Sequence, residues 1–222
     1  RIAASMEEAL VFDSGSSATL IYDGETLVWK GIQDNALPST PSEDGWIHIS
    51  SVNEFAALLS GGGQKGAKYH ICNDMDMSLL PLSITKDFRS DAMFEDICID
   101  GGVYAGESVP NDYKVNPQGT VRIFNLELPS ASGIFANVRN FEATNLVIED
   151  VIVGKESENQ EGTGVLIGKS YGKVTLKNVK VKDSEAIAPR RIGGAIGAVY
   201  GGEVMLNDCD LTSVKVSTSY KK

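Results

Sequence analysis

The sequence predicts a mainly β protein in which residues 46–222 form a parallel β-helix and residues 1–45 form an N-terminal β-hairpin region with a linker. Two observations predict this fold. Segments with one shared apolar pattern recur along the chain, and only one segment carries clear helix signals. Short strand-rich repeats cannot bury their apolar faces alone, so they stack into the coils of a solenoid. A right-handed winding is the commoner choice for such coils.

A hairpin is predicted near the N-terminus. The β-prone runs 18–22 and 26–29 flank Asp23 and Gly24. Asp-Gly between two such runs is a strong hairpin signal. The prolines, serines and glycine that follow within residues 35–45 indicate a linker or loop.

A capping box predicts one short helix. Ser51 stands three residues before Glu54, apolar residues follow at helical spacing, and Gly61 is placed to end the helix. The runs 46–49 and 67–72 on either side of this helix are typical of short strands.

An eight-residue pattern recurs at 121–128, 141–148, 174–181 and 204–211. Positions 1, 3, 6 and 8 are apolar in each segment. This pattern predicts two short strands whose alternation slips by one residue at a bend. Position 5 is always Asn or Asp: Asn125, Asn145, Asn178 and Asp208. We expect these side chains to form a hydrogen-bonded ladder between stacked coils; the alternative is that Asn is simply a common turn residue.

A second repeated element has small residues that bracket an apolar pair. It occupies residues 132–136, 164–168 and 193–197. Gly164 and Gly193 are 29 residues apart, as are Gly168 and Gly197. We therefore expect the last two of these elements to lie side by side in neighbouring coils.

These elements resemble those of the GLUG-repeat proteins, which are common among surface and secreted proteins of gut Bacteroidetes. The resemblance lies in the bracketed glycine elements and in the lead-in from Trp46 to Ser78, which contains a short helix and ends in Asn73-Asp-Met-Asp-Met-Ser78. Ala136 stands where the family closes an element with glycine. The resemblance implies a parallel β-helix of the kind found on bacterial adhesins or peptidase stalks. The N-terminal hairpin is similar to a region of fimbrillin-type surface proteins.

Composition restricts the function. The chain has 20 Lys and Arg against 30 Asp and Glu, a net charge of −10, so we expect no nucleic-acid partner. No apolar run approaches the roughly 20 residues of a membrane-spanning helix. The only histidines, His48 and His70, have no ligand-spaced partner, so we expect no zinc site. Cys72, Cys98 and Cys209 lie far apart and are predicted to act as small buried hydrophobes. No cofactor is implied.

Two tyrosines share one repeat position. Tyr171 and Tyr200 are 29 residues apart and should stack in neighbouring coils. They have two interpretations: an exposed platform for sugar rings, or an aromatic ladder that stabilises the coils.

Two loops leave neighbouring coils at equivalent points. One loop carries Arg190 and Arg191, and the other carries Glu156 and Glu158. We expect the four charges to lie close together, on the loop face where solenoids bind partners.

Asp74 and Asp76 form a weak candidate calcium site. These carboxylates alternate along a predicted strand and so point to one side, next to Asn73. The alternative is a polar outer face before a turn.

The sequence therefore favours a non-enzymatic cell-adhesion or glycan-binding module at a bacterial cell surface, with a host or neighbouring-cell glycan or protein as its partner. Two alternatives stay open: a carbohydrate-active β-helix enzyme, and a passive stalk that presents another domain. No Ser-His-Asp, Cys-His or phosphate-binding motif is present. The last predicted coil has an unpaired edge, so we expect self-association through it or a continuation of the chain.

Overall fold

The computed structural model describes residues 19–22, 27–30, 37–80, 92–102, 119–155 and 161–219. Contacts divide the chain into two compact units, Arg1–Ala36 and Leu37–Lys222. The described residues are mainly β, and among them α1 (Val52–Gly61) is the only α-helix. The mainly β prediction is confirmed. No helix in the described ranges is long and apolar enough to cross a membrane.

The first unit contains the predicted hairpin. Strands β1 (Thr19–Tyr22) and β2 (Leu27–Lys30) pair antiparallel, with Thr19 opposite Lys30 and Tyr22 opposite Leu27. The Asp23-Gly24 turn lies outside the described residues.

The second unit begins with a strand, a helix and a second strand. The capping box is confirmed: Ser51 Oγ accepts from the Glu54 N–H, and the Glu54 carboxylate accepts from the Ser51 N–H at 3.0 Å. Gly61, predicted to be the C-cap, is instead the last residue of the helix, and Gly62 is the C-cap, in the left-handed conformation with φ +76°. The predicted strands on either side are β3 (Ile47–Ile49) and β4 (Lys68–Ile71), which pair in parallel.

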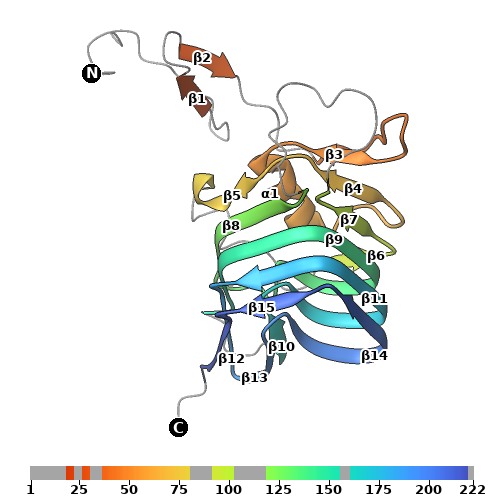
Figure 1. The fold of residues 1–222 in the computed structure, drawn as a ribbon, viewed down its shortest axis with the longest axis vertical. Coiled ribbons are helices and arrows are strands. Elements are labelled where there is room, and N and C mark those ends of the chain that lie inside the picture. The colour runs from red at the N-terminus through yellow and green to blue at the C-terminus, as the bar shows by residue number, and fades with distance from the viewer. Residues whose placement is uncertain are drawn as a thin grey trace, which may run out of the picture. The chain divides into compact units, whose positions relative to one another are not determined.

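Most strands of this unit join one large sheet dominated by parallel pairs. The order β14-β11-β9-β7-β4-β3 contains only parallel neighbours. Figure 1 shows β8, β9, β11 and β14 following one another along the stack. The arrangement is compatible with a β-helix, because parallel neighbours require a crossover between them. The remaining bounds on this path are β7 (Cys98–Asp100), β9 (Phe135–Val153), β11 (Ile167–Lys182) and β14 (Ile196–Asn207).

The other strands pair beside this path. Strands β6, β8 and β12 pair with different parts of β9, β5 pairs with β8, β16 pairs with β12, and β15 pairs with β11, all in parallel. Strands β10 and β13 form a separate parallel pair. Their bounds are β5 (Met75–Asp76), the 3-10 turn η2 (Met77–Leu79), β6 (Met93–Glu95), β8 (Val121–Leu128), β10 (Glu161–Gly164), β12 (Glu185–Ala188), β13 (Arg190–Gly193), β15 (Asp210–Thr212) and β16 (Lys215–Thr218).

The apolar pattern of the repeats builds the core. In β8 the buried residues are Val121, Ile123, Leu126 and Leu128, which are positions 1, 3, 6 and 8. The alternation slips at Asn125, whose φ is +57°. Asn and Asp enter this left-handed region more easily than other residues with a side chain. The predicted bend is confirmed, and the other three residues at position 5 also have positive φ.

The register of the first repeat differs from the prediction. Val121 pairs with Leu146, so β8 lies beside residues 146–153 rather than beside 141–148. The earlier part of β9 pairs with β7 instead, with Cys98 opposite Glu142. Both registers satisfy the same alternation of buried residues, and β7 already fills the position assumed for β8.

The bracketed elements lie side by side as predicted. Gly164 is in register with Gly193, and its N–H donates to the Ser132 carbonyl at 2.9 Å. A Cβ at Gly164 would stand 2.5 Å from the Gly197 nitrogen. Glycine is required here because neighbouring backbones approach too closely for a side chain.

The C-terminal strands β14, β15 and β16 expose apolar residues whose register partners in the preceding strands are buried. Leu206 is 56% exposed, whereas Leu176, its register partner in β11, is 2% exposed. Leu211 and Val216 are 54% and 48% exposed. An apolar edge is therefore present in the last rows that the structure describes.

Candidate functional site

Tyr171 and Tyr200 stack directly. Their ring centroids are 5.4 Å apart and their planes differ by 16°. Tyr171 lies on β11 and Tyr200 on β14, next to a register shift between Ser170 and Gly172. Tyr200 is 42% exposed, so the pair is open to solvent at this end. The predicted stacking of these two tyrosines is confirmed.

Two arginines flank the stacked rings. The Arg139 guanidinium lies 6.0 Å from the Tyr171 ring centroid, because Arg139 and Tyr171 are paired in register. The Arg191 guanidinium lies 5.4 Å from the Tyr200 centroid, and its Nη1 donates to the tyrosine hydroxyl at 2.7 Å. Guanidinium groups are attracted to the negative faces of aromatic rings. We call Arg139, Tyr171, Tyr200 and Arg191 the tyrosine–arginine platform.

Sequence reasoning missed Arg139 and assigned other partners to Arg191. Glu156 and Glu158 lie outside the described residues, so their expected proximity to Arg190 and Arg191 stays a prediction. Backbone register does place Glu161, at the start of β10, opposite Arg190.

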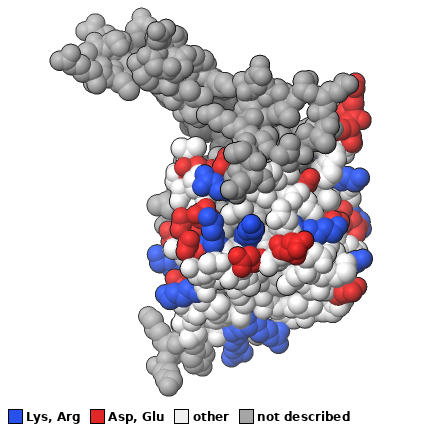
Figure 2. Space-filling model, viewed as in Figure 1, with Lys and Arg blue, Asp and Glu red and all other residues white. Residues whose placement is uncertain are grey.

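Elsewhere, opposite charges on neighbouring strands pair. Figure 2 shows acidic and basic side chains interspersed over the face in view. Lys177 Nζ lies 2.7 Å from Glu142 Oε1, and Lys182 Nζ lies 2.8 Å from Glu149 Oε1. Glu149 lies within β9. It stays in the strand because β9 continues to Val153 and pairs with β8.

The predicted ladder forms over part of its length. Asn178 Nδ2 donates to Asn145 Oδ1 at 2.9 Å, and Asn145 Nδ2 donates to Asp100 Oδ1 at 2.8 Å. Both asparagines are half-buried. Asp208 lies opposite Asn178, because the flanking residues of the two rows are in register.

Asn125 does not belong to this ladder. The different register of β8 moves it away from Asn145, and its Nδ2 donates to Asp76 Oδ1 at 2.9 Å. Expecting all four residues in one ladder was therefore wrong. The recurrence of Asn and Asp at position 5 reflects the shared left-handed backbone as well as the ladder.

Asp74 and Asp76 serve different partners. Asp74 accepts from Arg122 N at 2.8 Å and from Arg122 Nε at 2.9 Å. Burial acts to raise the pKa of Asp76, but hydrogen bonds from Asn125 and Ser78 outweigh it and hold that pKa below its ordinary value. An arginine thus takes the place that a cation would need at Asp74.

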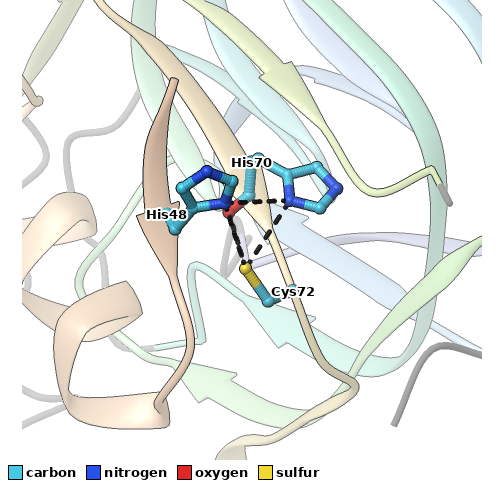
Figure 3. Close-up of side chains that lie close together, drawn as sticks. All are labelled: His48, His70 and Cys72. Atoms are coloured by element: carbon cyan, nitrogen blue, oxygen red, sulfur yellow. Dashed lines mark hydrogen bonds between the residues drawn. The ribbon is translucent and has the colours of Figure 1, made fainter. Parts of the chain in front are cut away.

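The structure brings together three side chains that the spacing argument separated. His48 Nδ1 and His70 Nδ1 are 3.3 Å apart, and Cys72 Sγ lies 3.5 Å from each of them. Figure 3 shows the two rings and the sulfur converging; His48 lies on β3, His70 on β4, and Cys72 directly after β4. Among the described residues, this is the only group of three or more His, Cys, Asp or Glu side chains arranged to hold a metal ion. Excluding a zinc site on spacing alone was therefore unsound.

The cluster forms because β3 and β4 are parallel and in register. His48 pairs with His70 across the strands, and Cys72 follows His70 by two residues, on the same face. His70 and Cys72 are 4% and 3% exposed. The sequence signal was present: two histidines at equivalent positions of consecutive strands, the second followed by a cysteine two residues later.

No protein-family model, curated protein or solved structure matches this chain.

Proposed function

We propose that the chain is a non-enzymatic glycan-binding module of a bacterial cell surface and that its parallel strands form the coils of a β-helix. Parallel pairing at short sequence intervals supports the β-helix: register partners are 22 residues apart between β3 and β4 and 29 or 30 apart between β11 and β14. The resemblance to GLUG-repeat proteins supports the surface location.

The observation that carries the binding function is the stacked pair Tyr171 and Tyr200. Aromatic rings can stack against the C–H faces of sugar rings, and the part of the Tyr200 ring that is exposed beside Arg191 is the surface available for this contact. Arg139 and Arg191 lie beside these rings and carry N–H donors suited to hydroxyl and carboxylate oxygens. Aromatic rings with N–H donors beside them match the chemistry of a glycan, with a host or neighbouring cell as its source.

The test is a glycan array followed by titration calorimetry on the best ligand. We expect Tyr200→Ala to weaken binding about tenfold, or about 1.4 kcal/mol. Tyr200→Phe keeps the ring but removes the hydroxyl that accepts from Arg191, so we expect a smaller loss. Phe124→Ala is the matched control, because Phe124 also lies under an arginine, with Arg122 4.6 Å from its centroid, but stands on β8. It should leave binding unchanged.

Three outcomes would contradict the proposal. Absence of any glycan ligand would favour a passive stalk. Turnover of a bound polysaccharide would favour a carbohydrate-active enzyme. Tyr200→Ala that lowers the melting temperature but leaves glycan affinity unchanged would make the tyrosines a stabilising ladder.

A further inference from the structure

We propose that His48, His70 and Cys72 bind one divalent transition-metal ion of the zinc class. The ligand atoms are His48 Nδ1, His70 Nδ1 and Cys72 Sγ, which face one another in Figure 3. Imidazole nitrogen and thiolate sulfur are the ligands that zinc prefers. This site is distinct from the tyrosine–arginine platform and does not depend on the proposed glycan function.

The spacing of the three atoms fits a tetrahedral metal site. With metal–nitrogen bonds of about 2.05 Å and a metal–sulfur bond of about 2.3 Å, two ligand nitrogens stand about 3.35 Å apart and a nitrogen and a sulfur about 3.55 Å apart. The corresponding separations here are 3.3 Å between the two nitrogens and 3.5 Å from each nitrogen to the sulfur. The three atoms thus form one triangular face of a tetrahedron of the size that zinc requires.

In each histidine, the hydrogen bond made by Nε2 favours the tautomer whose Nδ1 lone pair can bind a metal. His70 Nε2 lies 2.9 Å from the Gly102 carbonyl oxygen, which can only accept, so Nε2 carries the proton. His48 Nε2 lies 2.9 Å from Asp44 Oδ2, and a carboxylate likewise accepts. In neutral rings both Nδ1 atoms then direct a lone pair into the cluster. A carboxylate or carbonyl behind a ligand histidine is the usual second layer of a metal site.

Two such lone pairs 3.3 Å apart repel each other unless a metal ion or a proton lies between them. A metal ion in this position also takes the Cys72 sulfur as thiolate. The competing arrangement is a proton shared between the two rings, which needs one imidazolium and no metal. Metal titration distinguishes the two.

We expect the fourth coordination position to face solvent on the side of His48, the most exposed of the three ligands. The His48 side chain is 24% exposed, whereas His70 and Cys72 are nearly fully buried. Three protein ligands with one accessible position leave room for water or another small exchangeable ligand. The metal would also tie β3 to β4, so binding should raise the melting temperature.

The test uses the full chain, stripped with EDTA and kept reduced. Titration with Co²⁺ should give one equivalent per chain with thiolate-to-cobalt charge-transfer absorption and the visible bands of a tetrahedral ion. Zn²⁺ should displace Co²⁺ and raise the melting temperature. Cys72→Ser should abolish the charge-transfer band and weaken Zn²⁺ binding more than 100-fold. Cys98→Ser and Cys209→Ser are matched controls that should retain both.

The variant Asp44→Asn tests the metal site without removing any of the three proposed ligands. This change removes the charge behind His48 but no ligand, so the band should persist while Zn²⁺ affinity falls 10–100-fold, the usual cost of losing a second-layer partner. Wild-type chain that binds no Co²⁺, or binds it without a thiolate band, would overturn the proposal and favour the shared proton. The wild-type spectrum decides the question even if Cys72→Ser fails to fold.

Discussion

Replacing Asn178 with alanine tests the ladder between the rows of β9 and β11. The Asn178 Nδ2 donates to Asn145 Oδ1 at 2.9 Å, and Asn178 has a φ of +49°. Losing the hydrogen bond costs about 1 kcal/mol at a half-buried site. Alanine in the left-handed region costs roughly a further 1–2 kcal/mol. We therefore expect Asn178→Ala to lower the free energy of unfolding by about 2–3 kcal/mol.

Urea melts provide the measurement, with Lys177→Ala as the neighbouring control. Lys177 is exposed and forms a surface ion pair with Glu142, so its removal should change stability little. The double variant with Asn145→Ala completes a cycle whose coupling term isolates the hydrogen bond from the backbone cost. We expect a coupling of about 1 kcal/mol. If Asn178→Ala matches Lys177→Ala, the reasoning about both terms is wrong. If the coupling energy is zero, the hydrogen bond contributes nothing, and Asn and Asp recur at position 5 of the repeats only because they tolerate the left-handed backbone conformation.

Three further outcomes follow from the geometry. Partial burial raises the pKa of the Cys98 thiol to about 11, so iodoacetamide should alkylate it slowly at about pH 8; rapid reaction there would contradict the raised pKa. A hydrogen bond from Ser217 lowers the pKa of Glu185 below 4.5. Its stabilising effect is therefore full above that value and lost as pH falls through the folded-state pKa, so melts of Glu185→Gln and wild type should differ at neutral pH and converge in acid. Because Leu206 and Leu211 are more than half exposed, light scattering should show concentration-dependent self-association that Leu211→Lys weakens, and a monomer at every concentration would refute this edge contact.

Local features of the fold were readable from the sequence. The capping box at Ser51 and Glu54 needs only residues close in the chain, and the structure contains it. The slip in alternation at Asn125 is also local, because one left-handed residue reverses which side chains face the core. The bracketed elements at Gly164 and Gly193 could be predicted because at each position nearby backbone atoms leave no room for a side chain, so glycine recurs there.

The register between β8 and β9, in contrast, could not be predicted from the sequence. The segment at β8 has one pattern of buried positions, and that pattern fits against 141–148 and against 146–153 equally well. The choice is made by β7, a three-residue strand that pairs with Glu142 and its neighbours and leaves the later part of β9 for β8. A strand this short has too few residues to show a period, so its effect on the register appears only in the folded chain.

The His48, His70 and Cys72 cluster was hidden by the same dependence on register. Spacing rules for metal ligands assume a local loop or one helix face, where ligands stand two to five residues apart. Here α1 lies between the two histidines, and the parallel pairing of β3 with β4 turns a separation of 22 residues into a contact. Once strands stack in parallel and in register, the useful comparison is between equivalent positions of neighbouring strands. By that comparison the two histidines are adjacent, and Cys72 is one alternation further along the same face.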